Sequence, residues 1–129
     1  MNITRTFAPV AVAMAAVLLV PAAPAMAKDG DVIRRGSCTG GGTWKLKASP
    51  EDGRIEVEGE IDTNRNGQHW RWVMRHNGSQ VASGHRTTRA PSGSFEVRRV
   101  LANRSGTDTF VFRARRVGTQ QVCQGVVRF

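Results

Sequence analysis

Apolar and polar side chains alternate along short segments of this chain from residue 31 onward. In the segment 54–62, Ile55, Val57 and Ile61 fall on one side of the alternation, and acidic side chains fall on the other. A period of two residues is that of a β-strand with one buried face, and no segment here has the period of an amphipathic helix. Clusters rich in Pro, Gly, Asn and Ser separate the segments about every ten residues, as in all-β proteins. The pattern therefore predicts an all-β domain.

The predicted strands are 31–38, 43–48, 54–62, 68–76, 79–88, 94–102, 108–117 and 121–128. Their alternation places Trp70, Trp72 and Met74 on one apolar face, and Phe110 and Phe112 on another. Exposed tryptophans could instead form a carbohydrate platform, but Trp70 and Trp72 share their side with Met74, which favours the core. Packing the apolar faces together gives a two-sheet antiparallel β-sandwich of immunoglobulin-like architecture, with seven or eight strands.

Two Asn-Gly pairs, at 66–67 and 77–78, stand between predicted strands. Asn-Gly is the strongest short-range signal for a β-hairpin, because both residues tolerate a positive φ. The segments 54–62, 68–76 and 79–88 are therefore predicted to form an antiparallel meander.

Two registers are open at the first of these turns. A two-residue turn places Asp62 opposite Arg71 and Glu58 opposite Arg75. A four-residue loop places Glu60 opposite Arg71 and Glu56 opposite Arg75. Either register pairs carboxylates with guanidinium groups, which stabilises neighbouring strands.

The second turn and a later break in the alternation give two further predictions. A two-residue turn at 77–78 pairs Met74 with Val81 and Trp72 with Ser83. The alternation is interrupted at Arg98-Arg99, which predicts a β-bulge there.

The segment 62–67 also resembles the start of a calcium-binding loop, with Asp62, Asn64 and Asn66 on alternate positions before Gly67. Such a loop carries a bidentate glutamate at its twelfth position, which is Val73 here. The segment also runs into a predicted strand rather than a helix. A turn is therefore favoured over a calcium site.

The first 27 residues have the features of an export signal. Arg5 precedes an apolar run over 10–20, and Ala25-Met26-Ala27 is a small-x-small cleavage signal. A retained membrane anchor is the alternative, but the apolar run is shorter than the roughly 20 residues that span a bilayer. We therefore expect a signal peptide at 1–27, cleavage after Ala27, a single domain at 28–129 and an extracellular location.

The chain has two cysteines, Cys38 and Cys123. An even number of cysteines in an exported protein predicts a disulfide, and free or metal-binding thiols are the alternative. The bridge closes a loop of about 85 residues, for which the chain-entropy model gives roughly 4–5 kcal/mol of stabilisation.

No catalytic constellation stands out in the sequence. The three histidines, His69, His76 and His85, are predicted to lie on different faces or far apart, so that they cannot share one metal ion. The acidic stripe of segment 54–62 is predicted to face solvent, where a catalytic acid would not acquire a raised pKa. We therefore predict no catalytic residue, no metal and no cofactor, and a non-enzymatic protein.

The formal net charge is +9, and arginines dominate the C-terminal half, where only Glu96 and Asp108 oppose them. A basic face attracts polyanions by releasing counterions. The candidate anion-binding residues are Arg98, Arg99, Arg113, Arg115 and Arg116. Expected partners are an anionic cell-wall polymer, a polysaccharide or an acidic extracellular protein, while export argues against genomic nucleic acid.

An uncharacterised hydrolase is the alternative to a non-enzymatic protein. Two alternatives to a binding face remain open. One is a solvated basic surface without a ligand. The other is an extracellular inhibitor or effector that docks on another protein through a loop, at 89–94 or 103–107.

The segments RRGSCTGGGTWKLKASPEDGRIEVEGEIDTNRNGQHWRW, HNGS and TTRAPSGSFEVRR resemble a set of small secreted actinobacterial proteins. The resemblance implies an export signal and a sandwich-like domain with one disulfide, and it assigns no activity or site residue. The architecture is also similar to immunoglobulin-type sandwiches, with departures. The chain has no tyrosine, so a tyrosine corner is excluded. Because Cys123 lies close to the C-terminus, the bridge is expected to tie terminal strands.

Overall fold

The computed structural model describes residues 30–129 and contains eight β-strands. In chain order they are β1 (Val32–Ser37), β2 (Thr43–Glu51), β3 (Arg54–Asp62), β4 (His69–His76), β5 (Ser79–Thr87), β6 (Ser94–Leu101), β7 (Thr109–Arg116) and β8 (Val122–Arg128). The all-β prediction is confirmed, and most strand ends lie within one residue of the predicted ones. Residues 30–129 include no helix long and apolar enough to cross a membrane. The predicted signal peptide at 1–27 lies outside the described residues.

Strand β2 extends past its predicted end at 48 and includes Pro50. A proline donates no backbone hydrogen bond, so it is tolerated in a strand only where one neighbour is missing. β1 pairs with β2 only as far as Ala48, while Pro50 still lies opposite Ile55 of β3. The strand can therefore continue through the proline because no β1 residue faces it there.

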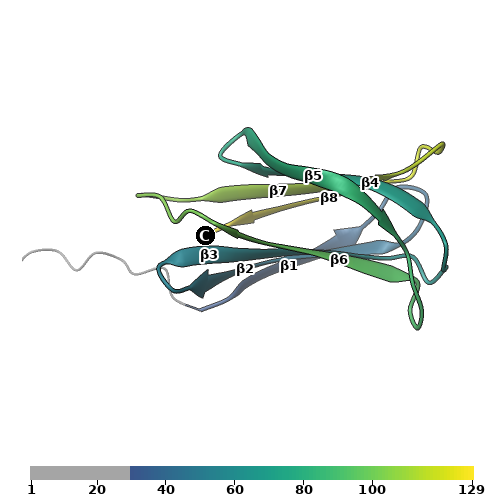
Figure 1. Ribbon diagram of the computed structural model, residues 1–129, viewed down its shortest axis with the longest axis horizontal. Coiled ribbons are helices and arrows are strands. Elements are labelled where there is room, and N and C mark those ends of the chain that lie inside the picture. The colour runs from purple at the N-terminus through teal and green to yellow at the C-terminus, as the bar shows by residue number, and fades with distance from the viewer. Residues whose placement is uncertain (1–29) are drawn as a thin grey trace, which may run out of the picture.

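The strands form two antiparallel four-stranded sheets. One sheet has the order β1-β2-β3-β6, and the other has the order β5-β4-β7-β8. Figure 1 shows the two sheets as stacked layers, with the C-terminus between them. The predicted β-sandwich is confirmed. Its strand order differs from that of immunoglobulin domains, in which the second strand pairs with the fifth, whereas here β2 pairs with β1 and β3.

The apolar faces that the alternation predicts all point into the space between the sheets. Trp70, Trp72 and Met74 of β4 are fully buried, as are Ile55 and Ile61 of β3. This confirms the facing of the strands and the core position of both tryptophans.

Aromatic rings fill the space between the sheets by packing on bare backbone. A Cβ atom added at Gly59 of β3 would lie 2.6 Å from a ring carbon of Phe112 on β7. On the other side of the sandwich, one added at Gly125 of β8 would lie 2.5 Å from the ring of Trp44 on β2. Each ring therefore occupies space that a side chain on the facing sheet would otherwise fill. The packing of the two sheets is specific for this reason.

The predicted meander over 54–88 is wrong at its first connection. β3 and β4 belong to different sheets, so the chain crosses the sandwich between Asp62 and His69. The Asn66-Gly67 turn is present, with Gly67 at φ 78°, but it forms only part of this crossing. The Asn64 N–H donates to Asp62 Oδ1 over 3.0 Å, and Asn64 has φ 57°. The Asp62 carboxylate therefore shapes the loop that leads away from its own sheet.

Neither predicted pairing of the β3 carboxylates with Arg71 and Arg75 occurs, because those arginines lie in the other sheet. Glu58, for example, lies opposite Lys47 on β2 and Arg98 on β6. The predicted pairings with Arg71 and Arg75 are therefore wrong, and the basic neighbours of the β3 carboxylates come from β2 and β6.

The second hairpin, between β4 and β5, is confirmed at the Asn77-Gly78 turn, but its register shifts. His76 lies opposite Ser79, and a bulge between Met74 and Arg75 then moves the remaining pairs by one residue. Met74 therefore pairs with Ala82 rather than Val81, and Trp72 pairs with Gly84 rather than Ser83. An added Cβ at Gly84 would come within 3.1 Å of the Trp72 indole, so the shift places the smallest residue beside the largest ring.

The bulge predicted at Arg98-Arg99 does not form. β6 pairs with β3 in one continuous register from Leu101 to Ser94. Arg99 shares the inward side of β6 with Val97, yet it stays only half-buried. β6 is an edge strand, so a long side chain there can lie across the rim of the core without breaking the ladder.

The disulfide closes one side of the sandwich. Cys38, which directly follows β1, is bonded to Cys123 of β8, and β1 and β8 are the edge strands of the two sheets on that side. This confirms the predicted bridge and its position on terminal strands. The other edges, β5 and β6, have no covalent link. A structural disulfide fits a protein that folds outside the cytoplasm.

We predict that replacing both cysteines, as Cys38→Ala with Cys123→Ala, lowers the free energy of unfolding by roughly 4–5 kcal/mol, because the unfolded chain gains the entropy of an open loop. Urea denaturation of the two forms measures this loss. Reduced wild-type protein is the matched control, since it opens the same loop with both sulfur atoms in place. A loss below about 1 kcal/mol in both samples would contradict the prediction.

Candidate anion-binding surface

The two sheets differ in charge. Every acidic residue that lies within a strand belongs to β2, β3 or β6, and strands β5, β4, β7 and β8 contain neither aspartate nor glutamate. The sequence separates the charges only along the chain, with acidic residues at 51–62 and arginines later. The fold turns this linear separation into one sheet of mixed charge and one sheet that is only basic.

The outer side of the basic sheet carries five exposed arginines, which we call the arginine face: Arg71 and Arg75 on β4, Arg113 and Arg115 on β7, and Arg128 on β8. They point outward because the alternate residues on these strands fill the core. Arg71 lies directly opposite Arg115 in the β4–β7 ladder. Side chains paired in this way are about 5 Å apart at Cβ, and like charges so placed destabilise the sheet.

The arginine face is hollowed beside Arg71, Arg113 and Arg115. An open depression of about 450 Å³ is lined by Arg71, Val73, His85, Arg113, Arg115, Val117 and Gly118. Val117 gives it an apolar rim, with 54% of its surface exposed. Arg113 Nη1 donates to Gln124 Oε1 over 3.0 Å, which holds one guanidinium group on the sheet. The depression therefore combines three arginines, one of them held by Gln124, with a small apolar surface.

On the outer side of the other sheet, carboxylates and basic side chains of the same sheet form ion pairs. Its ion pairs are Glu56 with Arg98, Lys47 with Glu58 at 3.2 Å, and Lys45 with Glu60 at 3.7 Å. Lys45, Lys47 and Arg98 of this sheet therefore have carboxylates beside them, unlike the arginines of the arginine face.

These ion pairs change the proton affinities of their members. The hydrogen bond from Arg98 holds the pKa of Glu56 below its usual range. Burial, followed by a hydrogen bond with Glu56, raises the pKa of Glu58. The contact with Glu58 raises the pKa of Lys47. Glu56 is thus held as a carboxylate by Arg98 at neutral pH.

The structure divides the five predicted anion-binding arginines among four places. Arg113 and Arg115 lie on the arginine face, and Arg98 is bound to Glu56 on the opposite sheet. Arg99 reaches over the core at the open edge, with its Cζ atom 5.0 Å from the Trp72 ring centroid. Arg116 ends β7 and lines a separate cleft near the disulfide. Only two of the five are therefore brought together.

Arg71, Arg75 and Arg128, the other members of the arginine face, were not among the predicted anion-binding residues. The alternation correctly shows that Arg71 and Arg75 point outward, and this was the available signal. The sequence predicts that Arg71 and Arg75 pair with the carboxylates of β3. Because the chain crosses to the other sheet between β3 and β4, these pairs do not form.

A buried polar pair, His76 with Asp108, was also missed. His76 Nε2 lies 2.5 Å from Asp108 Oδ1, and the exposed fractions of their side chains are 2% and 0%. The imidazole stacks on Phe110 at 4.5 Å between centroids, and Asp108 Oδ2 accepts from the Arg104 N–H over 3.2 Å. His76 is therefore a buried residue at the end of its strand. Asp108 lies in the interior, hydrogen-bonded to His76, and is not part of the arginine face.

The remaining residues considered as ligands are placed as follows. His69 and His85 are exposed on β4 and β5, and His85 lies opposite Arg71. Within residues 30–129, no group of three or more His, Cys, Asp or Glu side chains is arranged to hold a metal ion.

Comparisons of the chain with protein-family models, with curated proteins and with solved structures find no match.

Replacing Arg115 with glutamine should raise the free energy of unfolding by about 0.2–1 kcal/mol at low salt, because the change removes the repulsion from Arg71. The gain should shrink as added salt screens the charges. Thermal or urea unfolding at low and high ionic strength measures both effects. The matched control is Arg98→Gln, which removes an arginine that has a carboxylate partner and should lower the stability. Equal destabilisation by both changes would contradict the repulsion.

The Arg98→Gln variant should also alter the response to acid. The pKa of Glu56 is lowered in the folded protein, so its contribution to stability is present above the unfolded pKa of about 4.3 and is lost as the pH falls through the folded pKa. The stability difference between wild type and Arg98→Gln should therefore be largest near neutral pH and shrink below about pH 4. Urea unfolding across this pH range measures the difference. The stability difference between wild type and Glu56→Gln should shrink at low pH in the same way. A difference that does not change with pH would exclude Glu56 as its source.

Proposed function

We propose that this protein is a secreted, non-enzymatic binding module that holds an anionic polymer through the arginine face. The observation that carries the proposal is the set of five exposed arginines on a sheet whose four strands contain no carboxylate. Opposed arginines such as Arg71 and Arg115 repel each other in the free protein. An anion bound between them removes that repulsion, so the arrangement favours an occupied face.

A polymer suits this face better than a single small anion does. Neighbouring strands are about 4.8 Å apart, and alternate residues along a strand are separated by nearly 7 Å. The guanidinium groups therefore form an array from β4 to β8. A chain with repeated phosphate, sulfate or carboxylate groups can contact several of them at once and release a counterion at each contact. Arginine's planar fork is suited to bidentate contact with such oxyanions.

The location supports a polymer found outside the cell. The export signal expected at 1–27 and the disulfide between Cys38 and Cys123 both fit an exported protein. Phosphate-bearing wall polymers and acidic polysaccharides are the corresponding ligand class, and an acidic extracellular protein is the alternative partner for the same surface.

We predict that Arg113→Gln with Arg115→Gln weakens binding to fluorescently labelled inorganic polyphosphate by about tenfold or more at low salt. The slope of log K against log salt should become shallower by roughly two contacts. Fluorescence anisotropy over a salt series measures both quantities, and polygalacturonate tests a carboxylate polymer in the same way.

The matched control is Arg34→Gln with Arg35→Gln, which removes the same charge from exposed positions on β1 of the other sheet. This variant should retain the wild-type affinity and salt slope. Equal losses in both variants would show that only net charge matters. Salt-independent binding, or no binding to either polymer, would overturn the proposal.

A further inference from the structure

A small polar cleft lies at the end of the sandwich where the disulfide is located. It has a volume of about 300 Å³ and is lined by residues 40–42, Thr63, Arg65, Gln68, Arg116 and Gln121. These residues come from the connection after β1, the crossing from β3 to β4, and the turn between β7 and β8. Figure 1 shows the crossing and the β7–β8 turn at the same end of the molecule. The cleft is separate from the arginine face and shares none of its five residues.

One wall of the cleft is fixed by the disulfide and by hydrogen bonds beside it. The bridge joins Cys38, which precedes the glycine run, to Cys123 of β8. The Thr39 N–H donates to Val122 O over 2.8 Å, and Gln121 Nε2 donates to Gly41 O over 2.6 Å. Residues 40–42 contribute backbone atoms alone, because glycine has no side chain. This wall is therefore held against β8 at several points.

The opposite wall is fixed by the loop that precedes β6. Thr88 is buried, and its hydroxyl donates to Arg65 O over 2.6 Å. The Thr63 N–H donates to Gly93 O over 3.0 Å. A Cβ atom at Gly93 would lie 2.2 Å from the Arg65 nitrogen, so the two loops touch along their backbones. Both walls are thus preorganised, which lowers the entropic cost of binding a ligand.

The charge of the cleft is positive. Arg65 and Arg116 line it, and no carboxylate does. Neither arginine forms an ion pair with any residue in the part of the chain described, 30–129. Two arginines that line a cleft of this size and have no carboxylate partner favour a small oxyanion.

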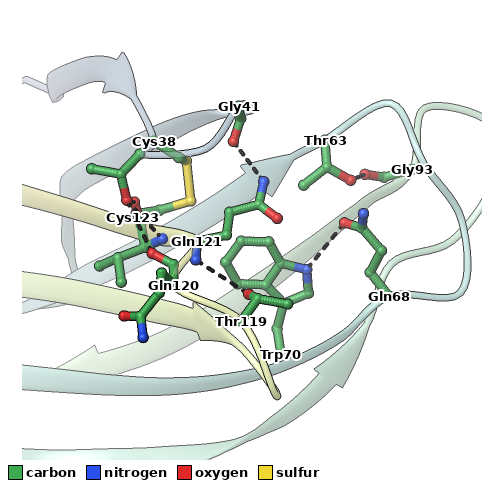
Figure 2. Close-up of a disulfide and its surroundings, with 12 residues drawn as sticks. Cys38, Gly41, Thr63, Gln68, Trp70, Gly93, Thr119, Gln120, Gln121 and Cys123 are labelled. Carbon is green, nitrogen blue, oxygen red and sulfur yellow. Dashed lines mark hydrogen bonds between the residues drawn. A yellow bond between two sulfur atoms is a disulfide. The ribbon is translucent and has the colours of Figure 1, made fainter.

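The cleft also offers hydrogen bonds of both kinds. The Gln121 amide nitrogen is committed to Gly41, because a carbonyl only accepts, so the Gln121 oxygen remains as an acceptor. The Gln68 oxygen accepts from Trp70 Nε1 over 3.4 Å, so the Gln68 nitrogen remains as a donor. Figure 2 shows the Gln121 oxygen turned toward the side on which Thr63 and Gln68 lie. A sulfate ion has no hydrogen for the Gln121 oxygen, whereas a sugar hydroxyl supplies one.

We infer that this cleft binds an anionic monosaccharide, with its carboxylate or phosphate between Arg65 and Arg116 and its hydroxyl groups on Gln121 and Gln68. The volume is at the lower limit for ligand sites in proteins, which suits one sugar unit rather than a chain. The inference does not depend on the arginine face, because the two sites use different residues.

Titration of the ¹⁵N-labelled protein with glucuronate, with glucose 6-phosphate, with glucose and with sulfate tests the site by NMR. We expect at least one anionic sugar to give saturable shifts centred on residues 40–42, 63–68 and 116–121. Glucose and sulfate should each bind about tenfold more weakly or worse. Comparison of the two anionic sugars shows whether a carboxylate or a phosphate is preferred.

The double variant Arg65→Gln with Arg116→Gln should lower the affinity for the preferred anionic sugar by about tenfold or more. Arg113→Gln with Arg115→Gln removes the same charge from the arginine face and should leave sugar binding unchanged. Unaltered thermal unfolding establishes that each variant is folded. If the Arg65→Gln, Arg116→Gln variant does not fold, Gln121→Leu takes its place as the test. This change removes the acceptor for a sugar hydroxyl and should weaken the binding of the sugars more than the binding of sulfate.

Three results would overturn the inference. The first is the absence of saturable shifts with both anionic sugars, and the second is glucose binding as tightly as they do. The third is sulfate binding as tightly as the sugars, which would identify an oxyanion site without sugar recognition. Polyphosphate binding at the arginine face is measured separately, so its failure and the failure of this site are distinguishable.

Discussion

The packing of aromatic rings on bare backbone between the sheets determines which side chains face outward. Phe112 of β7 lies against Gly59 of the facing sheet, and Trp72 of β4 lies against Gly84 of the neighbouring strand in its own sheet. In a strand, a shift of one residue would move every side chain to the other face. The fit of these rings therefore excludes the alternative facing of β4 and β7. With Trp72 and Phe112 held inside, Arg71, Arg113 and Arg115 have no position available except the outer surface.

The same physics explains what could be predicted from the sequence. Which side of a strand is buried is a local property, because the alternation within that strand decides it. The prediction that Trp70, Trp72 and Phe112 are buried is therefore confirmed. The partner of a strand is a property of the whole fold. Asn66-Gly67 is a good hairpin signal, yet the chain crosses to the other sheet there because β3 pairs with β2 and β6. The pairing of the β3 carboxylates with Arg71 was wrong for this reason.

The sequence could predict the candidate site only where the side of the strand on which a residue lies is enough to place it. Arg113 and Arg115 are candidates because they lie in the arginine-rich C-terminal half, and they reach the outer surface because they alternate with core residues on β7. Arg98 and Arg99 fall within the same arginine-rich part of the sequence, but β6 joins the mixed sheet, where Glu56 binds one and Trp72 stacks with the other. Arg116 ends its strand, so its surroundings depend on loops from elsewhere in the chain. The burial of His76 could not be predicted from its own strand, because its partner Asp108 lies 32 residues away in the sequence.

The arrangement of the two sheets relates stability to binding. Opposed arginines on β4 and β7 cost about 0.2–1 kcal/mol for each close pair, and no carboxylate in their sheet offsets this. The disulfide contributes roughly 4–5 kcal/mol through the unfolded chain, without using any side chain of the arginine face. Its position on β1 and β8 also holds the glycine run beside Gln121. A single covalent bond thus stabilises a sheet whose surface charges repel one another and fixes one wall of the polar cleft at its end.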